Sequence, residues 1–200
     1  MLIARRNRIA WIATALPALA FTGLKIWQGF GANPVEEITH YTGQTALIFL
    51  LLSLTITPAR RWIGNRVAPL RRIFGLAAFG YALMHFLTYV VLDLFFSWSA
   101  LLDDLSKRSY ITAGFVAFVI LLLLAGTSNK AAIRRLGRRW ATVHRLVYIA
   151  VIAAIVHLWW QTKADFLEPS IYAATALILL ALRLPNFTKA ASKNNQSAKR

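Results

Sequence analysis

The sequence predicts an all-α integral membrane protein, a bundle of six transmembrane helices with both termini in the cytoplasm. Three observations lead to this fold class. The composition is 58% hydrophobic and only 15% charged, whereas soluble domains are roughly 45–50% apolar and 25% charged. Six apolar stretches recur along the chain, and basic residues gather in alternate connections between them. Because one crossing takes about 20 apolar residues, the 200 residues leave no room for a separate soluble domain.

Each predicted crossing is an apolar stretch bounded by charge, proline or glycine. The first contains Pro17 and has a secretory signal as its alternative, because arginines precede it. Its apolar run continues to Ile26, which favours a crossing helix. The last contains Arg183, whose side chain we expect to extend back to the membrane surface. The six stretches are residues 9–27, 41–57, 73–92, 109–127, 142–160 and 170–184.

The 23 basic residues are distributed unequally among the connections. Nineteen lie before the first stretch, around the second-to-third and fourth-to-fifth connections, or from Arg183 onward, and all seven acidic residues lie on the other side. The positive-inside rule therefore places both termini in the cytoplasm. This topology and attraction to anionic lipid explain the formal net charge of +16, so we expect no nucleic-acid partner. Residues 1–185 form one predicted domain, and 186–200 form a polar, basic, disordered cytoplasmic tail.

The chain contains no cysteine. This excludes disulfides, iron–sulfur clusters held by thiolates, and heme ligated by or attached to cysteine. Any metal must therefore be held by the four histidines or by oxygen ligands.

His85 and His157 lie deep inside two predicted crossings, where an ionisable side chain indicates function by default. His85 follows Arg72 by thirteen residues, and His157 follows His144 by the same number. At 1.5 Å per residue both rings lie roughly 20 Å from the cytoplasmic surface, so two helices offer imidazoles at one depth. No carboxylate lies there to complete a zinc or di-iron site, whereas heme b with two imidazole ligands needs nothing more. The alternative is that each ring only bonds a polar group of a neighbouring helix.

His144 and Arg71 define a second candidate site near the cytoplasmic surface. Two hemes stacked across a membrane use histidines spaced like His144 and His157, although thirteen residues turn an ideal helix by about 220°. The corresponding positions before His85 hold Arg71 and Arg72, so the second site lacks a paired histidine. Two alternatives stay open. His144 ligates a second heme with an unusual ligand such as Arg71, or it only borders a cofactor or quinone, with Arg71 paired to a lipid phosphate or heme propionate.

His40 opens the second crossing on the periplasmic side and lies too far out to share the plane of His85 and His157. We expect an interfacial hydrogen bond there, with partner docking or quinone contact as the alternatives. Met84 is the only methionine inside the chain, and beside His85 it is interpreted as a packing residue.

Several short motifs resemble those of one family of membrane proteins. They are residues 31–35 (GANPV), 40–43 (HYTG), 55–58 (TITP), 71–76 (RRIFGL), 85–89 (HFLTY) and 136–140 (LGRRW), with His144 and His157. With these motifs the chain resembles the ferric-reductase-like transmembrane superfamily and, within it, the small bacterial MsrQ family of heme-binding subunits. The resemblance covers nearly the whole chain. Larger eukaryotic relatives carry four heme histidines, and this chain departs from them at Arg71.

The resemblance implies an electron conduit in the bacterial inner membrane. Quinol or menaquinol would supply electrons to heme b, and a periplasmic molybdenum-containing partner, MsrP, would receive them to reduce methionine sulfoxide in oxidised proteins. The family also implies FMN, whose phosphate would face the cytoplasmic arginine loops. The chain itself is expected to carry electrons and to perform no substrate chemistry.

Two other functions compete with this interpretation. A small transporter or proton relay would use the intramembrane histidines, but the crossings contain no central acid and the chain has no inverted repeat. A ferric or superoxide-generating reductase would need a soluble nicotinamide and flavin module, for which no residues are left.

The periplasmic face is the predicted docking surface, because it carries all seven acids and only four basic residues. Its two long loops are predicted at residues 29–43 and 93–109. We expect electrons to enter in the cytoplasmic half and to leave at this face. The partner is expected to dock on Glu36, Glu37, Asp103 and Asp104.

Overall fold

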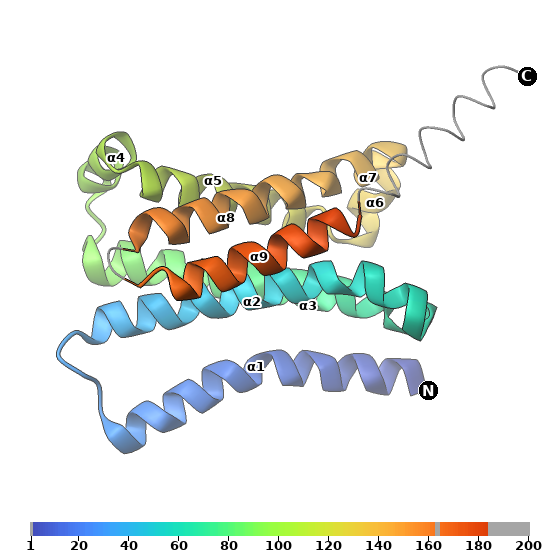
Figure 1. The fold of residues 1–200 in the computed structure, drawn as a ribbon, viewed down its shortest axis with the longest axis horizontal. Helices are drawn as coiled ribbons and strands as arrows, with labels where there is room; N and C mark the ends of the chain where they lie inside the picture. Colours follow the sequence, from blue (N-terminus) through green and yellow to red (C-terminus); the bar gives the residue numbers. More distant parts are fainter. Residues whose placement is uncertain (1, 163–164, 184–200) are drawn as a thin grey trace, which may run out of the picture.

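The computed structural model describes residues 2–162 and 165–183, and these residues form helices joined by short connections, without a β-strand. The long helices run antiparallel along the long axis of the molecule (Figure 1). They are α1 (Leu2–Gln28), α2 (Pro34–Ile63), α3 (Ala68–Thr88), α5 (Ser109–Gly126), α8 (Val147–Gln161) and α9 (Leu167–Ala181).

Shorter helices lie in the connections. They are α4 (Trp98–Lys107), α6 (Lys130–Leu136) and α7 (Arg138–Val143). Single 3₁₀ turns, η1 (Asn65–Val67) and η3 (His144–Leu146), lead into α3 and α8, and a π-helical turn, η2 (Tyr89–Asp93), ends α3.

Within the described residues, five helical segments are long and apolar enough to cross a membrane. They are Asn7–Gln28, Pro34–Arg60, Asn65–Asp93, Ser109–Gly126 and Arg138–Gln161. They correspond to the first five predicted crossings. The sixth corresponds to α9, a mainly apolar helix whose 15 residues span only about 22 Å, which is shorter than a standard crossing. A sixth crossing therefore stays a prediction, and residue 184 with the 186–200 tail lies outside the described residues.

The two ends of the bundle differ in charge. The α1–α2, α3–α5 and α8–α9 connections meet at one end, on the left of Figure 1, and all seven acidic residues lie in these connections or in the helical turns beside them. We call this the acidic end. The start of α1, the α2–α3 connection, α6 and α7 lie at the other, which we call the basic end.

The predicted long loops at 29–43 and 93–109 are wrong, because both are largely helical. The Asn33 side chain accepts a hydrogen bond from the Glu36 amide at 3.2 Å, and Pro34 occupies the first helical turn, so α2 begins well before Gly43. Ser97 caps α4 in the same way. These capping signals act outside the apolar runs from which the crossings were predicted.

Helix α1 is attached to the bundle where Pro17 interrupts it. The Ala18 amide donates to the Tyr81 hydroxyl at 3.1 Å, and this hydroxyl donates to the Thr14 carbonyl at 2.9 Å. In an uninterrupted helix that amide and that carbonyl bond each other, so the Tyr81 side chain of α3 bridges an opened turn of α1. Tyr41 of α2 also donates to the Pro17 carbonyl, at 2.5 Å.

Arg183 is buried, contrary to the expectation that it extends to the membrane surface. Its side chain donates to the Leu54 carbonyl of α2 and, at 3.1 Å, to the Tyr148 hydroxyl of α8. The physical reason lies at Pro58, which has no amide hydrogen to give to the carbonyl four residues earlier. Arg183 supplies the missing donor and ties the end of α9 to α2.

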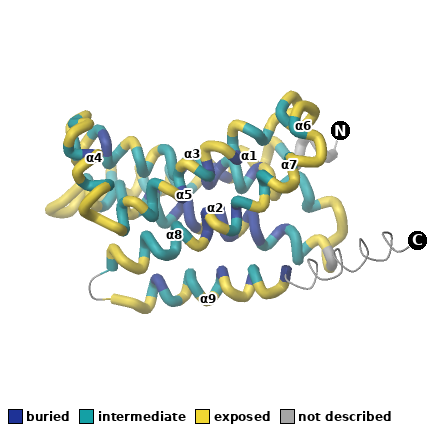
Figure 2. The backbone as a smooth tube through the Cα atoms, turned by 90° about the horizontal axis from the view of Figure 1, so that it is seen from above, coloured by how far each residue is buried: buried dark blue, intermediate teal, exposed yellow. Residues whose placement is uncertain are grey.

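The buried core lies among α2, α3, α5, α8 and α9, where dark blue segments gather in Figure 2. Leu50, Leu54 and Val151 are almost completely buried. Large apolar side chains cover the outside of the bundle, and Leu19 and Leu177 are 66% and 68% exposed. An apolar exterior around a packed interior is expected when lipid surrounds the helices.

Candidate functional site

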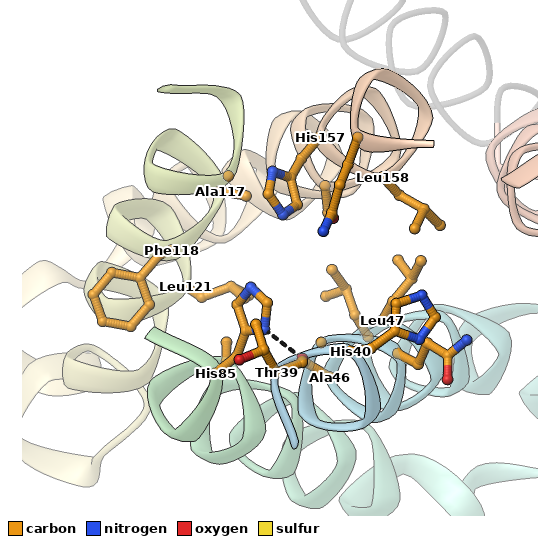
Figure 3. Close-up of a pocket in the computed structure, with 17 residues that line it drawn as sticks. Thr39, His40, Ala46, Leu47, His85, Ala117, Phe118, Leu121, His157 and Leu158 are labelled. Atoms are coloured by element: carbon orange, nitrogen blue, oxygen red, sulfur yellow. Dashed lines mark hydrogen bonds between the residues drawn. The ribbon is translucent and has the colours of Figure 1, made fainter. Parts of the chain in front are cut away.

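Two histidines face each other between the helix pairs α2–α3 and α5–α8. His85 comes from α3 and His157 from α8, and their ring centroids are 6.0 Å apart with the ring planes at 79°. Figure 3 shows the two rings pointing toward one another across a cavity. The proximity that the sequence predicts from equal depth is therefore present in the fold.

Each imidazole is oriented by a backbone carbonyl of the neighbouring helix. His85 Nδ1 lies 2.8 Å from the Thr39 carbonyl oxygen of α2, and His157 Nδ1 lies 2.7 Å from the Tyr110 carbonyl oxygen of α5. A carbonyl oxygen only accepts, so each Nδ1 carries the hydrogen. In the neutral ring Nε2 then keeps a free lone pair, which is the state in which an imidazole binds a metal.

The cavity continues on both sides of the histidine pair. One part, of about 700 Å³ including its open mouth, is lined mainly by α2, α5 and α8, and the other, of about 740 Å³, lies toward α4 and η2. Both parts are lined by His85 and His157 together with Thr39, Gly114, Phe118 and Gln161. We call the two parts together the histidine cavity.

The histidine pair fits a metal that brings its other ligands with it. The described residues contain no group of three or more His, Asp or Glu side chains that could hold a metal ion. The two ring centroids are 6.0 Å apart, so both imidazoles border the same space. Two free Nε2 atoms beside a mostly apolar cavity therefore suit heme, whose porphyrin supplies the remaining nitrogens.

Polar groups of the histidine cavity gather toward the acidic end. His40, Gln44 and Gln161 line one part, and Figure 3 shows His40 at the edge opposite Phe118. His40 is exposed at this edge, and the interfacial hydrogen bond predicted for it stays a prediction.

A second polar edge lies on the other side of the histidine pair, where Tyr89 and Arg108 line the cavity. The Tyr89 hydroxyl donates to Asp104 at 2.5 Å, and Arg108 pairs with the same carboxylate at 3.1 Å. These bonds attach α4 to η2 and α5, so α4 borders the cavity at the acidic end.

A second cavity of about 900 Å³ lies toward the basic end and brings Arg71 and His144 together. We call it the inner cavity. His144 stacks on Trp140 with ring centroids 4.0 Å apart, and its Nε2 lies 3.2 Å from the Thr127 hydroxyl. That hydroxyl donates to the Leu123 carbonyl at 2.8 Å, so it accepts from His144 and leaves Nδ1 with the free lone pair.

Comparison with known proteins identifies the family. Residues 42–155 match the family described as the ferric reductase like transmembrane component. The chain is 43% identical over 185 residues to a Ralstonia nicotianae protein named protein-methionine-sulfoxide reductase heme-binding subunit MsrQ, covering 90% of this chain and 85% of that protein. The chain belongs to the MsrQ family.

Other MsrQ proteins are similarly close. The identity is 44% over 183 residues to the Rhodospirillum rubrum protein, with 90% of this chain and 88% of that protein covered. It is 42% over 194 residues to the Herminiimonas arsenicoxydans protein, with 94% and 88% covered. No solved structure matches the chain. The MsrQ relationship therefore extends over nearly the whole sequence, as the motifs predicted.

In this MsrQ-family chain the sequence-predicted site residues form two groups, His85 with His157 and His144 with Arg71. The sequence does not predict the carbonyl partners of the histidine pair, at Thr39 and Tyr110. A backbone acceptor leaves no signature in residue type. The only available signal was Gly43, which belongs to a family motif but has no side chain to suggest a role.

Proposed function

We propose that this chain is a membrane b-type cytochrome that carries electrons from quinol or menaquinol across the bacterial inner membrane to a periplasmic MsrP-like molybdoprotein. Its partner would use these electrons to reduce methionine sulfoxide in oxidised proteins. The observation that carries the proposal is the histidine pair, in which both Nδ1 atoms are bonded to carbonyls and both Nε2 lone pairs remain free. The names of the MsrQ relatives, which describe heme-binding subunits, support it.

The chain's own residues would hold heme b in a defined way. His85 and His157 would supply the imidazole nitrogens that hold the iron, with their tautomer set by the Thr39 and Tyr110 carbonyls. Apolar residues of α2, α3, α5 and α8 line most of the cavity and would surround the porphyrin. His40 and Arg108 are polar groups at its two edges that suit the carboxylates of heme. When bound, the heme supplies reversible one-electron transfer.

The inner cavity is the proposed place for a second heme, with His144 as its histidine ligand and Arg71 in contact with it. The site differs from the histidine cavity, because His144 offers Nδ1 and is held by stacking on Trp140. It also has only one histidine among its lining residues. A heme with one firm protein ligand is expected to be lost more easily than one with two.

We expect His144→Ala to remove part of the bound heme and to leave the signal of the His85 and His157 site unchanged. Arg71→Ala should lower the content of the second heme, because the arginine would pair with its propionate. Heme content by the pyridine hemochrome method and the low-temperature spectrum measure both effects. An unchanged heme content in His144→Ala would contradict a second heme, and an altered iron spectrum in Arg71→Ala would make Arg71 a ligand.

The direction of electron flow is proposed from the charge of the two ends. Basic residues at the basic end suit a cytoplasmic location and the phosphate of FMN, which the family suggests as a further cofactor. Quinol would be oxidised in this half, and the periplasmic partner would dock at the acidic end. The six crossings and cytoplasmic termini of this proposal require α9 to cross as the sixth helix despite its shorter apolar length.

The proposed docking surface uses only two of the four acids predicted from the sequence. Glu37 is engaged by Lys25 and the Gly31 amide, and Asp104 by Tyr89 and Arg108. Glu36 is at the exposed start of α2, and Asp103 is an exposed residue of α4 whose partner is the surface Lys107. The Glu36 carboxylate accepts a hydrogen bond from Asn33 at 3.1 Å, and both this contact and the Asp103–Lys107 pair are exposed, so the charges of Glu36 and Asp103 are accessible to a partner.

We expect the double reversal Glu36→Lys and Asp103→Lys to slow reoxidation of the prereduced protein by its periplasmic acceptor by about tenfold at low salt. The cause is loss of electrostatic attraction, so the difference should vanish at high salt. Stopped-flow absorbance measures the rate, and an unchanged heme spectrum is the control. Equal rates at low salt would contradict docking through these acids.

The proposed function is tested by the dithionite-reduced minus oxidised absorption spectrum of the purified protein. We expect the sharp bands of a low-spin b-type cytochrome. A protein expressed with adequate heme supply that remains colourless would rule the function out.

A further inference from the structure

The two histidines are held by the same local arrangement, repeated on two helix pairs. On α2, Gly43 lies against the His85 ring, and the carbonyl four residues earlier, at Thr39, bonds its Nδ1. On α5, Gly114 lies against the His157 ring, and the carbonyl four residues earlier, at Tyr110, bonds its Nδ1. The pairs α2–α3 and α5–α8 thus each contribute one histidine and one glycine.

Helix geometry explains why a glycine accompanies each of these carbonyls. Every Cα–Cβ bond of an α-helix tilts toward the helix N-terminus, so a side chain covers the turn that precedes it. The carbonyl four residues earlier lies in that turn and already accepts the amide hydrogen of the covering residue. When the covering residue is glycine and has no Cβ, the second lone pair of that carbonyl is accessible to a ring from the neighbouring helix. Gly43 and Gly114 therefore uncover the Thr39 and Tyr110 carbonyls.

The available space shows that only glycine fits without displacing the rings. A Cβ at position 114 would lie 2.7 Å from His157 Nδ1 and 3.0 Å from two carbons of the same ring. A Cβ at position 43 would lie 3.0 Å from His85 Nδ1 and 3.1 Å from Cε1. By contrast, a Cβ at Gly80 of α3 or Gly126 of α5 would meet no atom within 4 Å.

We propose that Gly43 and Gly114 are positioning residues of the cofactor site, whose missing side chains let Thr39 and Tyr110 set the tautomer and the direction of the two imidazoles. This inference rests on the proposed heme function. It adds that two glycines, on helices that carry no ligand, determine which nitrogen of each imidazole is available as a ligand. The closer approach at position 114 makes His157 the more sensitive of the two.

The hydrogen bonds have a consequence for the electron affinity of the site. An imidazole whose Nδ1–H is bonded to a carbonyl is a more basic ligand at Nε2 and favours the oxidised metal. Moving the ring off the carbonyl weakens this effect. An alanine at position 43 or 114 should therefore raise the midpoint potential of whatever heme is retained, and it should also weaken heme binding.

The test compares Gly114→Ala and Gly43→Ala with Gly80→Ala and Gly126→Ala in the full-length protein. We expect roughly 10–100-fold weaker heme retention in Gly114→Ala, as is usual when a group that orients a metal ligand is lost. Gly43→Ala should show a smaller loss, an altered low-spin EPR signal and a higher midpoint potential. The two control variants should keep the wild-type signal and be as stable or more stable, because alanine is the better helix former.

The outcomes separate this inference from the proposed function. If the wild-type protein binds no heme, the proposed function fails. If the wild type is a low-spin cytochrome and both Gly43→Ala and Gly114→Ala keep its EPR signal and midpoint potential, the positioning role is wrong. If Gly114→Ala does not fold, as shown by circular dichroism, Gly43→Ala decides. Reduced thermal stability with an unchanged signal and potential in Gly43→Ala would mean helix packing only and would overturn the inference.

Discussion

His85→Ala and His157→Ala are each expected to abolish the low-spin heme signal of the histidine cavity. Each change removes one of two Nε2 atoms, and the described residues contain no group of three or more His, Asp or Glu side chains that could hold a metal ion instead. The remaining imidazole cannot take the place of the lost ligand, because its orientation is set by its own carbonyl partner. EPR of the oxidised protein and the reduced-minus-oxidised spectrum both measure the loss.

The control for this prediction is Met84→Leu. Met84 is the chain neighbour of His85, but it is 46% exposed and lines a different cavity, among α1, α2 and α3. We expect it to retain the full spectrum, which also tests the interpretation of Met84 as a packing residue. Membrane fractions must contain the histidine variants at wild-type levels. A full low-spin signal in either histidine variant would assign the ligand elsewhere.

Much of the helix arrangement was predictable from hydropathy, and the reason is physical. A membrane-spanning helix must form its backbone hydrogen bonds within itself and expose apolar side chains to lipid. Each crossing therefore appears in the sequence as a long apolar run. The first five runs correspond to helical segments of sufficient length. The ends were less predictable because capping by Asn33 and Ser97 depends on single polar side chains. For this reason the sequence predicts loops where the structure has α4 and the start of α2.

The histidine pair was predictable in position but not in environment. Equal spacing from the basic end gave His85 and His157 the same depth, since helix rise per residue is constant. The carbonyls that orient them belong to α2 and α5, and helix pairing is not encoded in the spacing along one helix. Arg183 illustrates the same point, because its partner at Leu54 lies 129 residues away and depends on the missing amide of Pro58.

Replacing Arg183 by methionine is expected to lower the stability of the bundle by about 1–3 kcal/mol, the usual cost of a buried polar group without a partner. The Leu54 carbonyl would lose its donor in a region where Leu54 is 1% exposed and Arg183 only 3%. Methionine keeps the apolar stem of the side chain and removes the guanidinium. The melting temperature in detergent, followed by tryptophan fluorescence, should fall by several degrees.

A second substitution, Pro58→Ala, tests whether the Leu54 carbonyl is the reason why Arg183 stabilises the bundle. Alanine restores the amide that bonds the Leu54 carbonyl in a regular helix, so Arg183→Met should cost much less in a Pro58→Ala background than alone. Tyr148→Phe serves as the matched control, because it removes the hydroxyl partner of Arg183 and leaves the Leu54 bond intact. Its effect should be smaller and should not depend on residue 58. Strictly additive effects of Arg183→Met and Pro58→Ala would show that Arg183 stabilises the bundle through some other contact than the carbonyl that proline leaves open.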